Sequence, residues 1–154
     1  MAADRGDPID LDHFLNRHTS CLREFDHFIE QDRIDIDVRV RNSAQVRGRL
    51  YCLGGTYLEV QVFLPLNEWN QGHVRRYTFH AGIKRDDDRA IFRYDNAHTY
   101  LREGQPDAHH KHRFDVVTGR EIAPPEWIGR ERMPTLCSVL AELEQWWLET
   151  GQFL

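Results

Sequence analysis

The sequence has 154 residues, of which 40% are hydrophobic and 29% are charged. This balance is typical of a globular protein with its own core and excludes an intrinsically disordered chain. No apolar run is long enough for a membrane-spanning helix, and the acidic first ten residues do not resemble a secretory signal peptide. We therefore expect one domain over residues 1–154, in the cytoplasm, without membrane contact.

The net charge of −5 is distributed unevenly along the chain. Residues 1–37 carry −6, residues 38–93 carry +5 and residues 94–154 carry −4. A protein that is acidic overall does not attract nucleic acid over its whole surface. The basic middle nevertheless allows a local site for an anion.

The three cysteines, Cys21, Cys52 and Cys137, are far apart and form no Cys-x-x-Cys pair. An odd number of widely spaced cysteines is not typical of a disulfide framework or a zinc site. We interpret them as free thiols that fill the core.

The pattern at the start of the chain predicts a helix over residues 8–32. Asp7 and Pro8 form a typical helix start, an N-cap followed by proline at the first helical position. Apolar residues and one histidine then recur at steps of three and four, which is the period of one helix face. These residues are Leu11, Phe14, Leu15, His18, Leu22, Phe25 and Ile29.

From Ile34 onward the hydrophobic period changes to two, which indicates half-buried strands. Alternating segments separated by short turns predict an antiparallel meander of five to six strands within residues 33–117. A second amphipathic pattern predicts a helix over residues 134–150. We therefore expect an α+β fold in which both helices pack on one face of the sheet.

Four of the nine histidines, His98, His109, His110 and His112, fall within fifteen positions. Histidine titrates near neutral pH, so it can accept a proton in one step of a phosphodiester cleavage and donate one in another. A carboxylate can orient the imidazole, and a cation can stabilise the charged transition state. Candidate partners lie close by in the sequence: Arg93, Tyr94, Asp95, Asn96, Lys111 and Arg113.

Two other interpretations of the histidine segment remain open. His110 and His112 form a His-x-His pair, which on a strand puts both rings on one face, as in zinc or manganese sites, with His98 or Asp95 completing the site. No second carboxylate cluster is present to hold a pair of magnesium ions. The segment can also be a polar surface turn without a function.

The basic middle of the chain predicts a second candidate surface. Arg47 and Arg49 alternate outward on one predicted strand, as do Arg39 and Arg41 on its neighbour, and His80 and Arg76 can join them. With the rings of Tyr51 and Tyr57, such a face can bind single-stranded RNA through phosphate contacts and stacking. Alternatively, these side chains are simply solvated and pair with Asp35 and Asp37 across the strands.

The aromatic residues near the end of the chain indicate packing and association. Trp127 follows Pro124 and Pro125 and is expected to be a packed anchor. Trp146 and Trp147 are adjacent on the predicted helix, so we expect one to face the core and the other a partner surface. Together with open sheet edges, this pattern predicts a homodimer.

Two motifs resemble those of a known family. The stretch Ile91–His98 reads IFRYDNAH, and residues 109–112 read HHKH. Both are similar to segments of the TumE family, the toxin component of type II toxin–antitoxin systems, and the resemblance extends over residues 33–147. It implies a growth-inhibiting toxin and a cognate antitoxin protein that neutralises it.

The chemistry of the histidine segment and the resemblance together predict a toxin that is a metal-independent endoribonuclease, an RNA phosphodiester hydrolase. The expected partners are the antitoxin and RNA, with no cofactor. The alternatives are a non-enzymatic module that binds nucleic acid or protein, and a metal-dependent nuclease that uses the His-x-His pair. The candidate catalytic residues are His98, His110, His112, Asp95 and Lys111, and the candidate substrate-binding residues are Arg93, Tyr94, Asn96, His109, Arg113, Arg47 and Arg49.

Overall fold

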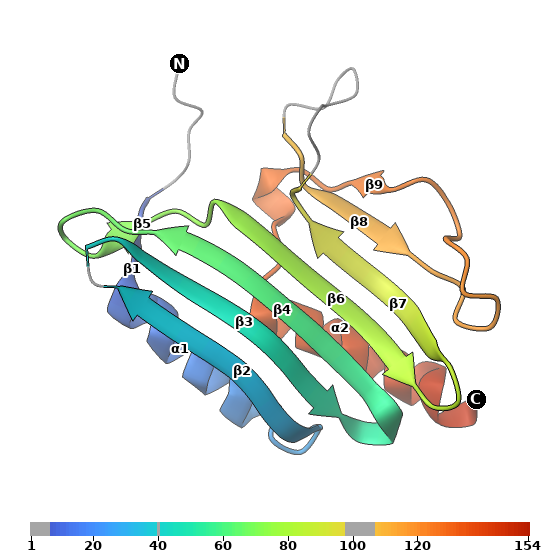
Figure 1. Ribbon diagram of the computed structural model, residues 1–154. Helices are drawn as coiled ribbons and strands as arrows, with labels where there is room; N and C mark the ends of the chain where they lie inside the picture. Colours follow the sequence, from blue (N-terminus) through green and yellow to red (C-terminus); the bar gives the residue numbers. More distant parts are fainter. Residues whose placement is uncertain (1–6, 40, 98–106) are drawn as a thin grey trace.

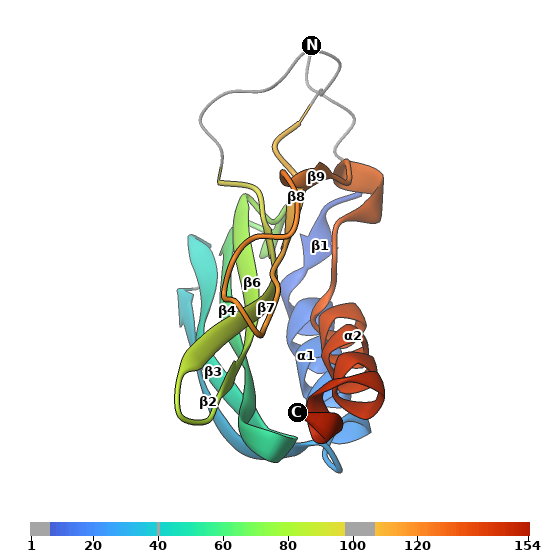
Figure 2. The same cartoon turned by 90° about the vertical axis from the view of Figure 1, so that its right-hand side faces the viewer.

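The computed structural model describes residues 7–39, 41–97 and 107–154. Within these ranges, seven strands form one antiparallel sheet in the spatial order β2-β3-β4-β6-β7-β8-β9 (Figure 1). Helices α1 and α2 lie on the same side of this sheet (Figure 2). The strands are β2 (Ile29–Arg39), β3 (Ser43–Cys52), β4 (Thr56–Pro65), β6 (Arg76–Lys84), β7 (Asp88–Asp95), β8 (His110–Arg113) and β9 (Glu126–Trp127).

The α+β class, with two helices and a large antiparallel sheet, is confirmed, whereas the predicted count of five to six strands is too low. The sheet also extends beyond the predicted range of 33–117 at both ends. Strand β9 is only two residues long and follows two prolines, so it has no detectable alternating pattern. Two further short strands, β1 (Ile9–Asp10) and β5 (Gln71–Gly72), pair with each other outside the main sheet.

Helix α1 (Leu11–Glu24) is shorter than the predicted span of 8–32. Its N-cap is Asp10, whose side chain accepts a hydrogen bond from the backbone N–H of Asp12 at 2.9 Å. Phe25 is the C-cap, and Ile29 already pairs with Cys52 in the sheet. Phe25 and Ile29 continue the helical spacing of the apolar stripe although they lie in the turn and in β2, so the pattern overestimates the helix.

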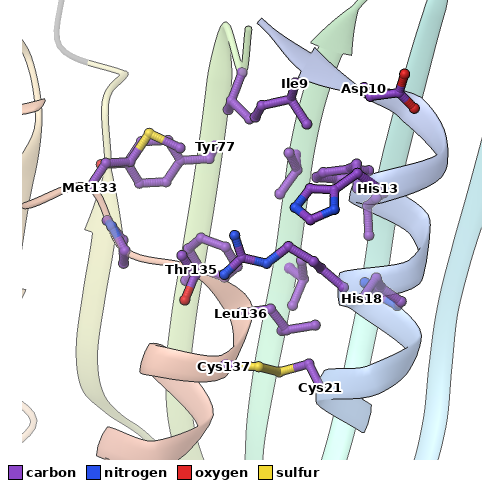
Figure 3. Close-up of a pocket in the computed structure, with 18 of the residues that line it drawn as sticks. Ile9, Asp10, His13, His18, Cys21, Tyr77, Met133, Thr135, Leu136 and Cys137 are labelled. Atoms are coloured by element: carbon purple, nitrogen blue, oxygen red, sulfur yellow. A yellow bond between two sulfur atoms is a disulfide. The ribbon is translucent and has the colours of Figure 1, made fainter. Parts of the chain in front are cut away.

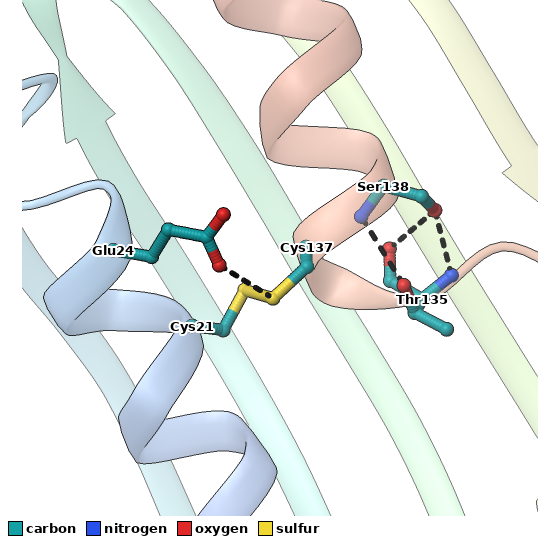
Figure 4. The surroundings of a disulfide bond; sticks show 5 residues. All are labelled: Cys21, Glu24, Thr135, Cys137 and Ser138. Carbon is teal, nitrogen blue, oxygen red and sulfur yellow. Dashed lines mark hydrogen bonds between the residues drawn. A yellow bond between two sulfur atoms is a disulfide. The ribbon is translucent and has the colours of Figure 1, made fainter.

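Helix α2 (Leu136–Glu149) starts and ends close to the predicted span of 134–150. Thr135 and Ser138 form a capping box at its start, with Ser138 N donating to Thr135 Oγ1 and Thr135 N donating to Ser138 Oγ (Figure 4). Val139, Leu140 and Leu143 are buried against the core. Three-residue 3₁₀ turns, η1 (Leu53–Gly55), η2 (Arg130–Arg132) and η3 (Gly151–Phe153), connect or end the main elements.

The largest core cluster lies between the helices and the sheet. It includes Phe28, Leu50, Leu58 and Tyr77, each at most 1% exposed. Trp146 and Trp147 are both partly buried against this cluster. The expectation that one of them is presented to a partner is therefore not supported by their placement.

A disulfide joins Cys21 of α1 to Cys137 of α2 (Figure 4). The prediction that all three cysteines are free is therefore wrong for this pair, and Cys52 is the free, buried one. The sequence did not reveal the bridge because the two residues are 116 positions apart. They meet only because both helices pack side by side on the same face.

None of the helices in the described ranges is long and apolar enough to span a bilayer.

The disulfide predicts a specific pattern of thiol labelling by iodoacetamide. Cys52 is 1% exposed, and burial raises the pKa of its thiol to about 12. The Cys52 thiol of the native protein should therefore resist labelling. The non-reduced protein in denaturant should gain one label, and the reduced protein should gain three. Mass spectrometry counts the labels; three labels without reductant would contradict the bridge.

Candidate functional site

The pairing of β6, β7 and β8 aligns polar residues in two rows across the sheet. His80, Arg93 and His112 are directly paired across the three strands. Thr78, Asp95 and His110 form the neighbouring row. Residues that are paired directly across strands share one face of a sheet.

The rows lie on the face of the sheet turned away from α1 and α2, here called the outer face. Tyr94 and Lys111 are paired between the two rows and so point to the opposite side, where both contact Glu142 of α2. Successive side chains of a strand alternate between faces. We therefore define the outer-face cluster as His80, Arg93, Asp95, His110 and His112.

Within this cluster, His112 lies between the carboxylate of Asp95 and that of Glu121, which follows β8 in the chain. Its Nδ1 atom is 2.8 Å from Glu121 Oε1, and its Nε2 atom is 3.4 Å from Asp95 Oδ2. Arg93 Nε donates to the same Asp95 oxygen at 3.0 Å. The hydrogen bond at Nδ1 fixes the orientation of the imidazole, which is what a proton-transfer residue needs.

His110 is oriented by the backbone. Its Nδ1 atom is 2.9 Å from the carbonyl oxygen of Ala108. Because a carbonyl can only accept, Nδ1 carries the proton, and in the neutral ring Nε2 is then the atom able to accept one. His110 and His112 are 6% and 5% exposed, so both rings are largely shielded from bulk water.

His80 extends the cluster toward the centre of the sheet. It is half-buried, and its ring stacks on Tyr57 with 6.2 Å between the centroids. Burial lowers the pKa of His80, which favours a neutral ring. His80 was expected beside the arginines of the basic middle, and the pairing of β6 with β7 brings it beside Arg93 as well.

The predicted residue Lys111 is directed to the helix side of the sheet. Its Nζ atom donates to Glu142 Oε2 at 2.7 Å and lies 4.9 Å from the centre of the Tyr94 ring. The Tyr94 hydroxyl donates to the other Glu142 oxygen at 2.5 Å. Burial, followed by this hydrogen bond, raises the pKa of Tyr94. Lys111 and Tyr94 therefore attach α2 to the sheet and do not lie with His110 and His112.

His109 is also separate from the outer-face cluster. Its Nδ1 atom is 2.8 Å from the hydroxyl of the buried Tyr77, and the two rings stack with 5.5 Å between centroids. Burial lowers the pKa of His109. The backbone N–H of His109 donates to Asp107, which fixes the start of β8.

Asn96 and Arg113 make connections that hold the strands in place. Asn96 accepts from the backbone N–H of Tyr77 at 3.0 Å and donates to the carbonyl of Arg75 at 3.1 Å, which joins the end of β7 to β6. Arg113 forms an ion pair of 3.1 Å with Glu126. His98, the remaining predicted catalytic residue, lies outside the described residues.

Arg47 and Arg49 lie on the outer face of β3, where they line a shallow hollow of about 360 Å³ with Arg33, Glu59 and Gln61. The guanidinium of Arg49 is 4.1 Å from the centre of the Tyr57 ring and forms an ion pair with Glu59. The partner of Arg49 is thus Glu59 of β4, not Asp35 or Asp37 as the alternative interpretation expects.

The two tyrosines of the predicted RNA-binding face differ in exposure. Tyr51 is 41% exposed, whereas Tyr57 is 3% exposed and donates to Asp88. The prediction that Tyr57 is available for stacking is therefore wrong. Arg49, the neighbouring strands and Asp88 enclose this ring, which an alternating pattern does not reveal.

Three carboxylates that organise the segment were not predicted from the sequence: Asp107, Glu121 and Glu142. Glu121 reaches His112 because the chain turns back after β8 and Phe114 pairs with Glu121. Glu142 comes from α2, thirty-one positions beyond Lys111. A contact between residues as far apart in sequence as Lys111 and Glu142 has no local sequence signal. Among the described residues, no three His, Cys, Asp or Glu side chains form a group suited to a metal ion.

Comparison with known families now adds to this geometry. The model of the family described as toxin TumE matches residues 18–147. The chain belongs to the TumE family. The match covers most of the chain, including the outer-face cluster and Cys21 and Cys137, and a toxin of this kind implies a cognate antitoxin. No curated protein and no solved structure matches the chain.

Substitution of Asp107 tests whether its hydrogen bonds hold the start of β8 in place. Its Oδ1 accepts from His109 N at 3.1 Å and from Trp127 Nε1 at 2.9 Å, and its Oδ2 accepts from Arg130 N at 2.9 Å. Asp107→Ala should therefore lower the free energy of unfolding by about 2 kcal/mol. Asp86→Ala, in an exposed turn, is the matched control and should change it by less than about 0.5 kcal/mol.

The contribution of Asp107 to the free energy of unfolding should also depend on pH. Burial opposes its ionisation, but the three hydrogen bonds outweigh burial and hold the pKa of Asp107 below its usual value. Its stabilisation is therefore complete at neutral pH and is lost as the pH falls from about 4 through the lowered pKa. Urea titrations at several pH values measure this; an equal deficit of the variant at pH 7 and at pH 2 would contradict the assignment.

Proposed function

We propose that this TumE-family toxin cleaves RNA without a metal ion and that the outer-face cluster performs the acid–base chemistry. The observation that carries the proposal is the placement of His112 between Asp95 and Glu121, beside Arg93 and His110. The cluster combines proton-transfer groups, an orienting carboxylate and a cation, which are the components of metal-free phosphodiester cleavage.

In the proposed reaction, the ribose 2′-hydroxyl attacks the adjacent phosphorus. His110 Nε2 takes the hydroxyl proton, because Nδ1 is committed to the Ala108 carbonyl. His112, oriented by the hydrogen bond between its Nδ1 atom and Glu121, gives the proton on Nε2 to the departing 5′-oxygen. Arg93 stabilises the charge on the phosphorus-bound oxygens. The products are a 2′,3′-cyclic phosphate and a 5′-hydroxyl.

RNA would approach along the outer face. Arg33 and Arg47, both exposed, and Arg49 surround the hollow on β3, and Tyr51 is exposed next to them. Arginine contacts to phosphates position a strand without regard to its base sequence. Lys111 and Arg113 are left out of this role because each is paired with a glutamate. His98 stays a candidate second acid or base.

The setting of the proposed reaction is the cytoplasm, where cellular RNA is found. The antitoxin would neutralise the protein by covering the outer face or by blocking its approach to RNA. We retain the homodimer as a prediction, because β2 is a sheet edge eleven residues long whose side chains are mostly exposed.

A second function has a specific observation in its favour. The low exposure of His110 and His112 is typical of rings that stabilise a fold, and the protein would then act by binding RNA or protein through the outer face. Such a module would bind its target without changing it. The two functions therefore differ in the state of RNA after incubation.

Purified protein should cleave single-stranded RNA in excess EDTA. Mapping of the ends should find cyclic phosphate or 3′-phosphate on the upstream fragment, since the 2′-oxygen is the nucleophile. RNA that is bound but intact would support the binding module. Cleavage that requires added Mn²⁺ or Zn²⁺ would instead support the metal-dependent alternative with the His-x-His pair.

Histidine variants test the assignment of roles. His112→Gln and His110→Gln should each lower the cleavage rate at least about 100-fold, which is a typical contribution of general acid–base catalysis. His27→Gln is the matched control, since His27 is exposed and pairs with Glu144, remote from the outer face. Growth inhibition and circular dichroism are measured in parallel; folded His110 and His112 variants that keep full toxicity and cleavage would refute the scheme.

A further inference from the structure

A second concave site lies on the other side of the sheet, between α1 and the start of α2. It is a pocket of about 450 Å³, within the size range of small-molecule sites. Its walls are mainly apolar and include Phe14, Val60, Val62, Val74, Phe79 and Leu136. Nothing in the proposed RNA chemistry uses this space.

The pocket is bounded along its length by this chain itself. Figure 3 shows Ile9 and Asp10 at one end and the Cys21–Cys137 disulfide at the other. Tyr77 and Met133 lie across from α1. Residues of this chain at both ends of the pocket limit the length of a ligand, which favours a small molecule over a segment of a partner protein.

The basic side chains in the pocket lining come from α1, and Arg17 is the one that carries a permanent charge. Burial lowers the pKa of His18, which favours its neutral ring. Arg17, His13 and His18 line the pocket at positions that share one helix side, and Figure 3 shows His13 directed toward the cavity. Arg17 is always protonated and forms no ion pair with any described residue. A guanidinium next to an apolar cavity is suited to a carboxylate.

The start of α2 adds a second favourable group. Thr135, Leu136 and Cys137 line the pocket, so the first turn of a fourteen-residue helix faces it. Thr135 Oγ1 already accepts from Ser138 N, so the backbone N–H groups of Leu136 and Cys137 are the ones that carry a partial positive charge without an intrahelical acceptor. The first turn of α2 contains no acidic residue to offset that charge.

The one carboxylate among the lining residues lies apart from Arg17. Asp10 caps α1 by accepting from Asp12 N. It is seven residues, or about 10 Å of helix, from Arg17. The permanent positive charge of the lining is therefore separated from Asp10, and most of the remaining wall is apolar.

We infer that the pocket binds an amphipathic monocarboxylate, such as a medium-chain fatty acid, with its carboxylate at Arg17 and the start of α2 and its alkyl chain against the valines of the sheet. The apolar walls account for the alkyl chain, and Arg17 with the start of α2 accounts for the carboxylate. The inference is independent of RNA cleavage, because it uses the opposite face of the sheet and different residues.

Calorimetric titration of the full-length protein with decanoate tests the inference directly. Decanoate should bind, and decanol, which keeps the chain but lacks the charge, should bind about tenfold more weakly or not at all. Equal binding of the two would show that Arg17 does not select an acid. Absence of decanoate binding would overturn the inference.

Variants locate the site. Arg17→Gln, on the exposed surface of α1, should weaken decanoate binding about tenfold and leave decanol unchanged. Arg23→Gln, in the last turn of the same helix and outside the pocket, is the matched control and should bind as the wild type does. Unchanged affinity in Arg17→Gln would place the ligand elsewhere.

A cavity-filling variant gives an independent measurement. Val62→Phe adds volume at the sheet wall and should abolish binding of both decanoate and decanol. RNA cleavage by the same variant should persist, so that failure of this inference is distinguishable from failure of the proposed function. Full decanoate binding to folded Val62→Phe would contradict the assignment, and the Arg17 comparison stands if that variant does not fold.

Discussion

The pairing of β8 with β7 decides on which side of the sheet each residue of the HHKH segment acts. Arg93 is opposite His112, Tyr94 is opposite Lys111 and Asp95 is opposite His110. Because a strand alternates its side chains, this register divides four consecutive polar residues between two environments. A shift by one residue would turn Lys111 toward the outer face and bury the histidines under α2. The chemistry proposed for His110 and His112 therefore depends on a backbone register.

Two sets of contacts hold this register, one on the helix side of β8 and one at the start of the strand. On the helix side, Lys111 and Tyr94 share the carboxylate of Glu142 from α2. At the start of the strand, Asp107 binds the backbone of His109 and the indole of Trp127. These contacts are partly buried, where removal of one partner of a charged pair is costly. They fix the strand on which the outer-face cluster is built.

Much of the fold could be predicted because it repeats local patterns. Alternation identified the central strands, and helical spacing identified both helices. The errors occur where a pattern is misleading or too short: Phe25 and Ile29 extend the helical spacing beyond α1, and β9 has two residues. His110, His112, Asp95 and Arg93 stay predicted site residues. The sequence pattern did not show that the pleat separates them from Lys111 and Tyr94, nor that Glu121 and Glu142 contact this segment, since Glu142 comes from α2.

The bridge between Cys21 and Cys137 has a topological consequence. Every strand of the seven-stranded sheet lies between these two residues in the chain. The entire sheet thus belongs to one covalent ring, from which only the first part of α1, most of α2 and the two tails extend. A protease that cuts once anywhere within the ring would open it without releasing a fragment. In an oxidising environment the nicked toxin would remain one covalent molecule, whereas after reduction only non-covalent packing would join its two pieces.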